Sequence, residues 1–306
     1  MEIEFNGDGK PFVMWGDNKI ILEMEPVTDK KVIEKAENEL RETPENVEHA
    51  LAELRRLLKA EKSLFVPVEK DEFLLKFLRP CKFYPESAFK KIQAYYKFRQ
   101  AHGYYCHDLV PTSVRSPFEH SIVSILSPRD QHGRRIMVIE AGEKWNPRLV
   151  PLKDTFRGMQ LGLEAAMAEA QTQICGVVVI MDMKGLSFTQ VMHFTPSYAK
   201  MMVDWVQDCV PVRIKAVHVI NQPYVFNMLY ALFKPFMREK LRARIHLHGS
   251  DMTSLFAHID PAALRKRHGG LLPEPEIPGD VLWKMLHHYE DEFKVASSYG
   301  YQSNNK

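Results

Sequence analysis

The sequence predicts an α/β protein with a helical N-terminal part, and three observations support that fold class. Apolar residues recur at helical spacing from about residue 47 to residue 103. Beyond Pro117, short runs typical of β-strands alternate with helical stretches, which predicts a sheet with helices around it. The most strand-like run, GVVVIMDMKG at residues 176–185, is continuously apolar, as expected for a central strand covered on both faces. A chain of 306 residues has ample length for a sizeable core.

Composition and the first residues predict a soluble protein of the cytoplasm. Apolar residues make up 45% of the chain and charged residues 26%, and no uncharged run reaches the length of a membrane span. The opening MEIEFNGDGK lacks the basic and then apolar layout of a signal peptide. Widely spaced cysteines without a CxxC pair predict neither a disulfide framework nor a zinc site. These are Cys81, Cys106, Cys175 and Cys209.

An acidic leader precedes a basic body. Residues 1–48 contain six Lys or Arg against thirteen Asp or Glu, a net charge of −7, which leaves +9 for the rest of the chain. One interpretation is an intramolecular mask over the basic face of the body. The other, which we prefer, is a loosely ordered solubilising segment. Residues 1–47 are therefore expected to form a partly disordered leader.

A small helical module is expected over residues 48–110. Its first helix carries apolar residues at helical spacing: Leu51, Leu54, Leu57 and Leu58. Further helices are predicted over residues 72–78 and 86–99, with a break between Pro80 and Pro85.

The next segment mixes strands and helices. Residues 122–126 and 135–140 are short β runs joined by a loop with Asp130 and Gly133, which predicts a hairpin. A helix is predicted over residues 152–173. A stripe at spacings of three and four marks its inward face: Phe156, Met159, Leu163 and Met167. The helix before residue 211 is expected to bury Tyr198, Met201, Met202, Trp205 and Val206.

The most informative stretch runs from residue 211 to residue 249. The β-branched run 216–220 suits a buried parallel strand. A helix with a wide apolar face follows and is kinked or ended near Pro235. Its apolar residues are Phe226, Leu229, Tyr230, Phe233 and then Phe236 or Met237. Between residues 213 and 244 there are also seven Lys or Arg and one acid.

This apolar helix with a cationic border has more than one interpretation. Composition alone favours an ordinary core helix with a solvated end. A peripheral membrane helix also fits, because its apolar residues enter the headgroup region while its cations meet anionic lipid. Nucleic-acid binding is disfavoured, since the helix is too apolar to track phosphates and no known RNA- or DNA-binding module accompanies it. No nucleic-acid partner is therefore predicted.

Nothing in the sequence predicts catalysis or a metal centre. His246 and His248 alternate on a strand and His287 and His288 adjoin on a helix, but none of the thirteen histidines stands in an HExxH or cysteine-paired arrangement. No GxSxG elbow or set of kinase signatures occurs. We expect solvated or hydrogen-bonded histidines, no enzyme activity, and no catalytic or metal-ligating residues.

Two runs within residues 211–249, PVRIKAVHVINQPYVF and KPFMREKLRARIHLHG, resemble the CRAL-TRIO lipid-transfer family. The resemblance is greatest to its tocopherol-transfer, retinaldehyde-binding and clavesin-like branch. FLLKFLR within residues 73–79 is similar to the family's three-helix N-terminal module, and DMKGL after residue 181 to its DxxG segment. The resemblance covers roughly residues 48–275.

The resemblance implies a fold and a division of the chain. The fold is a helical N-terminal module followed by a mixed five-stranded sheet, whose flanking helices enclose an apolar lipid pocket closed by a helical lid. Residues 48–110 form the module and residues 111–275 the lipid-binding domain. Residues 276–306 are expected to form a C-terminal helix and a disordered tail.

The resemblance also implies two sets of site residues and no cofactor other than the bound lipid. The basic residues that would engage a phosphoinositide headgroup are Arg79, Arg213, Lys215, Lys240 and Arg244. The residues that would line the lipid pocket are Phe156, Met159, Leu163, Val177, Val179, Met181, Met202, Trp205, Val206, Val217, Phe226, Leu229, Tyr230 and Phe233.

The sequence departs from the family's pattern in two places. Met159 and Leu163 stand where tocopherol-transfer proteins place serines, so a drier and softer wall is expected and tocopherol itself is in doubt. The family's Pro-x-Glu-Tyr-Gly-Gly ending is LRKRHGG here, with Arg265, Lys266 and Arg267 in it. These cations raise the question of a longer membrane-facing surface.

The expected function is binding and intermembrane transfer of a small hydrophobic lipid, such as a tocopherol, retinoid, carotenoid, sterol or phospholipid. Phosphoinositide at the target membrane would trigger exchange, and the protein would associate peripherally and reversibly with endosomal or other internal membranes. The alternative is a membrane-trafficking adaptor that reads phosphoinositides without obligatory cargo.

Overall fold

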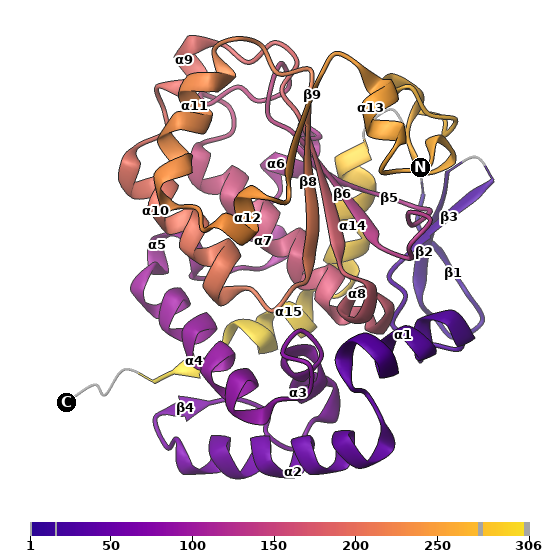
Figure 1. Cartoon of the computed structure of the whole chain (residues 1–306), viewed down its shortest axis with the longest axis vertical. Coiled ribbons are helices and arrows are strands. Elements are labelled where there is room, and N and C mark those ends of the chain that lie inside the picture. Colours follow the sequence, from indigo (N-terminus) through magenta and orange to yellow (C-terminus); the bar gives the residue numbers. More distant parts are fainter. Residues whose placement is uncertain (1, 16, 275–277, 303–306) are drawn as a thin grey trace.

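A five-stranded mixed sheet forms the centre of the computed structural model, which describes residues 2–15, 17–274 and 278–302. The strand order is β5-β6-β7-β8-β9 (Figure 1). Strands β5 and β6 form the antiparallel hairpin predicted from the sequence, and the remaining pairs are parallel. The strands are β5 (Val123–Leu126), β6 (Arg135–Glu140), β7 (Val177–Asp182), β8 (Ile214–Ile220) and β9 (Ile245–Gly249).

The two faces of the sheet pack against different sets of helices, because side chains alternate along each strand. On one face, Val178 and Ile180 of β7 contact an apolar cluster that includes Leu255 and Ile259. The helices on this side are α13 (Met252–Phe256), η4 (Pro261–Ala263) and η5 (Lys266–His268). The other face, which includes Met181 of β7, turns toward the larger helices.

Those helices form a layer beside the five-stranded sheet (Figure 1). They are α6 (Ser116–Glu119), α7 (Leu152–Ala168), α8 (Ala170–Cys175), α9 (Phe188–Val191), α10 (Pro196–Asp204), the π-helical turn η2 (Trp205–Cys209), α11 (Phe226–Phe233), η3 (Lys234–Phe236) and α12 (Glu239–Arg242). The predicted end of a helix near Pro235 corresponds to the change from α11 to the 3₁₀ turn η3.

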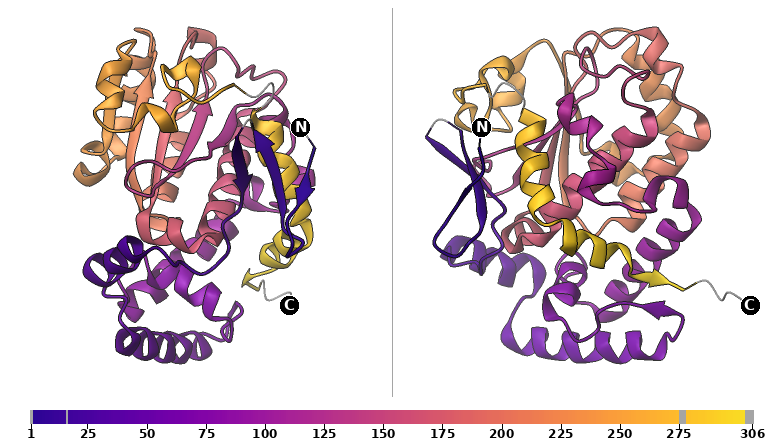
Figure 2. Two further views of the ribbon diagram at one scale, coloured as in Figure 1. Left: turned by 90° about the vertical axis from the view of Figure 1, so that its right-hand side faces the viewer. Right: turned by 180° about the vertical axis from the view of Figure 1, so that it is seen from behind.

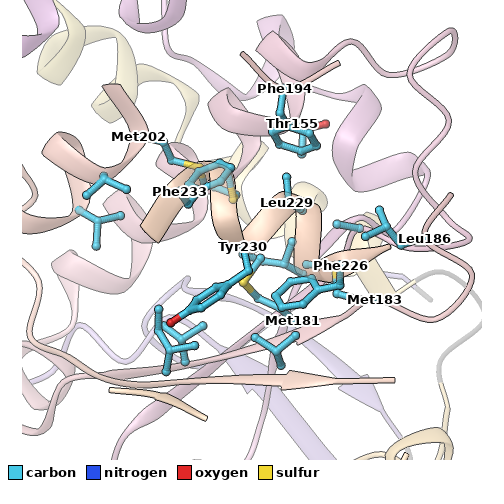
Figure 3. Close-up of a pocket in the computed structure, with 18 of the residues that line it drawn as sticks. Thr155, Met181, Met183, Leu186, Phe194, Met202, Phe226, Leu229, Tyr230 and Phe233 are labelled. Atoms are coloured by element: carbon cyan, nitrogen blue, oxygen red, sulfur yellow. The ribbon is translucent and has the colours of Figure 1, made fainter. Parts of the chain in front are cut away.

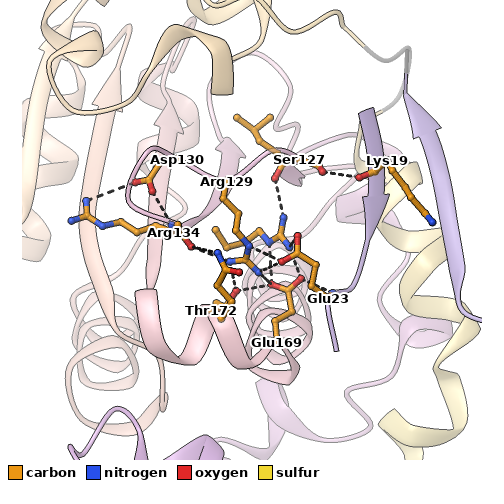
Figure 4. Close-up of polar contacts among 12 residues, drawn as sticks. Lys19, Glu23, Ser127, Arg129, Asp130, Arg134, Glu169 and Thr172 are labelled. Atoms are coloured by element: carbon orange, nitrogen blue, oxygen red, sulfur yellow. Dashed lines mark hydrogen bonds and ion pairs between the residues drawn. The ribbon is translucent and has the colours of Figure 1, made fainter. Parts of the chain in front are cut away.

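The single helix predicted over residues 152–173 is wrong, because the chain breaks into α7 and α8 at Glu169. Glu169 is extended (φ −85°, ψ 117°). Its carboxylate receives hydrogen bonds from Arg129, Arg135 and Thr172, at 3.0, 2.5 and 2.6 Å. Figure 4 shows this network, in which Glu23 of the leader also lies against Arg129. The buried ion pairs therefore account for the break.

The helical module has its own apolar core below the sheet. It contains α2 (Pro44–Ala60), α3 (Asp71–Leu78), α4 (Pro85–Ala101), α5 (Gly103–Cys106) and η1 (Pro111–Ser113). Thr43 caps α2 by accepting a hydrogen bond from the Asn46 N–H, with Pro44 at the first position. The buried core includes Leu54, Phe77 and Ile92.

The C-terminal segment returns to this module. After α14 (Pro278–His288) and α15 (Glu290–Ser297), strand β10 (Gly300–Tyr301) pairs antiparallel with β4 (Leu64–Phe65) (Figure 2). A disordered tail was predicted after residue 296, whereas the structure continues in regular form to Tyr301. Residues 303–306, to which that prediction also applies, lie outside the described residues.

The leader, for which partial disorder was predicted, has regular structure. Strands β1 (Glu4–Phe5), β2 (Pro11–Trp15) and β3 (Asn18–Ile21) form an antiparallel sheet, and α1 (Lys30–Leu40) follows. Val13, Ile20 and Leu22 are buried in the main core together with Leu282 of α14. These apolar residues order the leader because α14 supplies the surface that buries them.

Among the described residues, no helix has both the length and the apolar character needed to cross a bilayer.

Candidate functional site

An apolar cavity lies between the sheet and the helices α7, α10 and α11 (Figure 3). Its volume is about 170 Å³. The sheet contributes Ile139, Met181, Val217, Val219 and Ile245 to its wall. A cavity with such walls offers water few hydrogen-bond partners, so it suits an apolar guest better than solvent.

Helix α11 covers the cavity with one face. Phe226, Leu229, Tyr230 and Phe233 all line it, and their spacing of three and four residues places them on the same side of the helix. Figure 3 shows these side chains beside Met181 and Met183. The Phe233 ring also contacts Phe194 at a centroid distance of 5.9 Å. The predicted lid helix is therefore a wall of the cavity.

The few polar groups on the wall are largely occupied or neutral. Trp145 Nε1 donates to the Val150 carbonyl at 2.9 Å, and Thr155 Oγ1 lies 3.4 Å from the Pro151 carbonyl. Burial raises the pKa of Tyr198, so its phenol stays protonated. Such a wall can recognise an apolar molecule with at most a hydroxyl or similar group, and none of the described residues that line it is charged.

Most of the predicted pocket residues lie on the cavity wall. The structure places there Met159, Met181, Met202, Val206, Val217, Phe226, Leu229, Tyr230 and Phe233. The predicted residues that it places instead in the surrounding core are Phe156, Leu163, Val177, Val179 and Trp205.

The orientation of α7 explains this difference for Phe156 and Leu163. Thr155 and Met159, four residues apart, face the cavity, whereas Phe156 packs edge-on against Trp205 at 5.0 Å. Leu163, one turn beyond Met159, is buried in the core. Because α7 is buried on nearly every side, its apolar stripe does not single out the face that meets the cavity.

Sequence reasoning missed the other wall residues. They are Ile139, Ala141, Trp145, Leu152, Thr155, Met183, Leu186, Phe194, Tyr198, Val203, Val219, Met237, Leu241 and Ile245. Strand register could have found two of them, since Met181 is paired with both Ile139 and Val219. Phe194 lies between α9 and α10, where no periodicity marks it.

Polar contacts fasten the end of the lid to η2. Gln207 donates from Nε2 to the Phe236 carbonyl at 3.3 Å and accepts from the Arg238 N–H at 2.7 Å. The Arg238 guanidinium forms an ion pair with Asp208. We call these contacts of Gln207 and Asp208 the latch.

Large apolar side chains are exposed near the lid. Tyr224, two residues before α11, is 89% exposed, and Met228 of α11 is 50% exposed. Phe188 and Met192, on and just after α9, are 55% and 64% exposed. Helices α9 and α11 contact each other at one end of the molecule (Figure 1). Their exposed apolar side chains form an apolar rim beside the cavity.

Four of the five predicted headgroup residues are held around α8 and the start of β8; we call these four the basic cluster. Arg79 donates to Gln173 of α8 at 2.6 Å, and Arg213 donates to the Ile174 carbonyl. Lys215 follows on β8, and Arg244 donates to the Ile214 carbonyl at 2.6 Å. Burial and the charge of Arg213 lower the pKa of both Lys215 and Arg244. Such a pKa shift is expected where cations gather in a partly buried site.

Lys240, the fifth predicted headgroup residue, is exposed on α12, four residues before Arg244. Its neighbour Leu241 lies on the cavity wall. Helix α12 therefore joins the border of the basic cluster to the cavity.

Of the three cations after residue 264, one is buried in the fold and two, Lys266 and Arg267, are exposed. Arg265 is fully buried, and Arg265 and Arg267 both pair with Glu140, at 3.6 and 2.8 Å. Both belong to an ion-pair network, and burial excludes Arg265 from a longer membrane-facing surface.

Ligand atoms of Glu140, Asp182 and His268 lie within 4.8 Å of one another in this network. Burial would raise the pKa of Asp182, but the nearby His268 ring, 3.6 Å away, and the hydrogen bond from Asn221 outweigh it and lower the pKa to about 2. Cationic neighbours neutralise Glu140, among them Lys144 at 2.9 Å. The arrangement is that of a charge-compensated ion-pair network rather than an open cation site.

Comparison with known proteins agrees with this geometry. The CRAL/TRIO domain matches residues 119–270. The human "Alpha-tocopherol transfer protein-like" is 33% identical over 243 residues, which are 79% of this chain and 71% of that protein. Rat "Clavesin-2" is 30% identical over 271 residues (87% and 83%), and "Clavesin-1" of Pongo abelii 31% over 263 residues (84% and 73%).

The chain is also similar to a solved structure, "Crystal structure of Sfh5". The sequence identity is 12% and the TM-score 0.47, over 90% of this chain and 100% of that one. The family match and the identity to the tocopherol-transfer-like and clavesin proteins over most of their length lead to one conclusion. This chain is a member of the CRAL/TRIO family of lipid-binding proteins.

Proposed function

We propose that the protein binds one small hydrophobic lipid in the cavity and transfers it between membranes. The observation that carries this proposal is the apolar cavity under α11, whose wall combines aliphatic, aromatic and methionine side chains without a charged group. Tocopherol, retinoid and carotenoid chemistry all fit such a wall, and relatives named for tocopherol transfer support the class.

The energetics of transfer require this kind of wall. A lipid of about twenty carbons forfeits on the order of 0.8 kcal/mol per methylene on leaving a bilayer, so the protein must replace nearly all of that burial. Methionines are well suited to do so for molecules of irregular shape, because they are flexible and polarisable. The wall has several of them: Met159, Met181, Met183, Met202 and Met237.

Movement of part of the wall would let a large cargo enter. Helix α11 is the best candidate, since it is held by the latch and by aromatic contacts and is connected to η3 and α12. The apolar rim beside it would enter the headgroup region of a membrane, as in peripheral membrane helices. Contact with a membrane would thus act directly on the lid.

We propose that a phosphoinositide headgroup binds the basic cluster with Lys240 and promotes this movement. Each Lys or Arg near an anionic surface contributes roughly 1 kcal/mol, and several together are enough to bias a two-state lid. Guanidinium groups bind phosphate with two parallel hydrogen bonds, so a multiply phosphorylated inositol is favoured over a singly charged lipid. Helix α12 would couple headgroup binding to movement of the lid, since it carries both Lys240 and the wall residue Leu241.

The proposed setting is the cytoplasmic surface of endosomal or other internal membranes, with reversible attachment and no chemical change of the lipid. The alternative is a trafficking adaptor that binds phosphoinositides and carries no cargo.

One experiment separates these two functions. The purified protein is incubated with vesicles of mixed lipids, re-isolated and extracted, and the extract is analysed by mass spectrometry. One dominant lipid near one molecule per protein is expected for a transfer protein. Recovery of lipid-free protein that still binds phosphoinositide vesicles would favour the adaptor.

A further inference from the structure

Two carboxylates of the leader occupy the basic cluster. Glu39 is in the last turn of α1, and its Oε2 lies 2.7 Å from Arg213 Nη2 and 3.4 Å from Lys215 Nζ. Glu42, just after α1, accepts from Arg79 Nη2 at 2.7 Å and from Arg79 Nε at 3.0 Å. Three of the four cations are therefore already paired with anions from within the chain.

These contacts have the form that a phosphate would take. The Arg79 guanidinium holds Glu42 through two nitrogens, as it would hold two phosphate oxygens. Burial would raise the pKa of Glu39, but the hydrogen bond from Arg213 and the charge of Lys215 outweigh it and lower the pKa. Glu39 is thus a stable anion in this position.

We propose that α1 acts as a gate on the headgroup site: Glu39 and Glu42 mark two phosphate subsites, and a bis-phosphorylated inositol lipid binds by displacing them. This inference rests on the proposed function, and it deepens it by naming the ligand's two anchoring points and their regulation. The subsites are Arg213 with Lys215, and Arg79, whose guanidinium Gln173 orients by accepting a hydrogen bond from Nη1 at 2.6 Å.

The packing of α1 is suited to reversible release. The helix contacts the body through Val32, Ala36 and Leu40, which lie on Ile174 and Cys175 of α8, while most of its other side chains are exposed. It ends at Arg41, which has left-handed dihedral angles (φ 66°, ψ 27°), so the turn into α2 is a defined bend.

The strands before α1 have a separate anchor. Glu23 pairs with Arg129 at 2.7 Å and with Arg135 at 3.1 Å (Figure 4). The segment between Glu23 and the start of α2 could therefore move while the leader sheet stays attached.

A gate of this kind lowers the apparent affinity for the lipid. If α1 is docked in nine of ten molecules, the apparent dissociation constant is roughly ten times that of the open site. Removing the two negative charges weakens docking without changing the size of the side chains. The double variant Glu39→Gln/Glu42→Gln is therefore expected to bind more tightly, on the order of tenfold.

The test compares this variant with the wild type and with a matched control on the same helix. Glu34→Gln/Glu37→Gln makes the same change of charge at exposed positions of α1. Binding is measured by co-sedimentation with phosphatidylcholine vesicles that contain phosphatidylinositol bisphosphate. Vesicles with phosphatidylserine at equal charge form a second arm, and a soluble inositol trisphosphate competitor distinguishes a free headgroup from a membrane-bound one.

Tighter binding of Glu39→Gln/Glu42→Gln to bisphosphate vesicles, with the control unchanged, is the expected result. Equal binding of the two double variants would overturn the gate. Hydrogen exchange gives an independent measurement, since residues 30–40 should exchange faster when bisphosphate vesicles are present, and unchanged protection would also overturn it.

The gate can fail while the proposed function stands. If Arg213→Ala/Lys240→Ala loses bisphosphate binding but Glu39→Gln/Glu42→Gln gains none, only the gate is wrong. If Arg213→Ala/Lys240→Ala binds as the wild type does, the headgroup site itself is wrong.

Discussion

His218 Nδ1 lies 2.9 Å from His248 Nε2 on the face of the sheet opposite the cavity. His218 is 1% exposed, and the rings of His246 and His258 lie 5.1 and 5.0 Å from its own. His248 is also bonded to Ser254 Oγ at 2.6 Å. Of the two hydrogen-bonded nitrogens one must accept, so the pair is incompatible with two fully protonated rings.

This cluster predicts a loss of stability in mild acid. Burial, the neighbouring His248, His246 and His258, and Arg134 lower the pKa of His218 to about 3. The unfolded chain takes up this proton near pH 6.5 and the folded chain does not, so the stability is present above pH 6.5 and is lost as the pH falls toward 3. The slope from one such group is at most about 1.4 kcal/mol per pH unit.

Urea unfolding at pH 7.5 and pH 5 measures the effect. The difference in unfolding free energy between the two pH values should shrink in His218→Gln, which cannot titrate. An unchanged difference would show that other groups cause the acid sensitivity.

A charge on the cavity wall should abolish lipid uptake. Leu229→Arg places a guanidinium in an apolar cavity without a partner, so binding of a fluorescent hydrophobic ligand should weaken at least tenfold. Met228→Arg is the matched control, because Met228 is the preceding residue of α11 and is half exposed. Normal uptake by a folded Leu229→Arg protein would place the lipid elsewhere.

Loosening the latch should speed transfer. Gln207→Ala removes two hydrogen bonds, to Phe236 and Arg238, each worth about 0.5–1.5 kcal/mol, so lid opening should become roughly 5- to 150-fold more frequent. Hydrogen exchange at residues 226–236 should rise relative to β7, most clearly with anionic vesicles. Asn227→Ala, at an exposed position of α11 outside the latch, serves as the control. Equal, slow exchange in both segments would argue against an opening at α11.

The basic residues should govern membrane binding but not cargo affinity. Arg213→Ala/Lys240→Ala is expected to weaken phosphoinositide vesicle binding and slow ligand transfer, while ligand affinity in solution stays nearly unchanged. The control Lys62→Ala/Lys90→Ala removes the same charge from exposed positions of the helical module. Equal losses in the two variants would indicate diffuse attraction, which also weakens more steeply with salt.

Breaking the buried ion pairs at the α7–α8 junction should destabilise the fold. Arg135 and Glu169 are 2% and 1% exposed in their side chains and lie 2.5 Å apart. Glu169→Ala leaves the Arg135 charge buried with only Glu23 to offset it, so a loss of about 3–5 kcal/mol in unfolding free energy is expected. Glu23 is far more exposed, so Glu23→Ala should cost much less. Denaturant unfolding of both variants checks this order.

Features encoded by local periodicity could be predicted from the sequence. Strand β7 follows from its continuous apolar run and the apolar face of α11 from the spacing of its residues, whereas the resemblance implied that this face covers a cavity. Leu163 and Phe156 show where this fails, since a helix buried on nearly all sides has no distinguishing stripe.

Contacts between distant segments could not be predicted in this way. Glu39 meets Arg213 across 174 residues, and nothing near either residue in sequence identifies the other. Likewise, Val13 and Ile20 order the leader only because α14 lies beside them. The acidic charge of the leader hinted at a mask, but only the tertiary structure gives Glu39 and Glu42 their positions.

The pairing of β10 with β4 decides where mechanical freedom remains in the molecule. The helical module is joined to the sheet domain by the chain at residue 110 and again by this returning strand, so a hinge between the two bodies would have to tear a ladder of backbone hydrogen bonds. Contact with a membrane is therefore not expected to rotate the helical module against the sheet domain. The movement is therefore expected in α11, η3 and α12, short helical segments that no strand pairing holds in place.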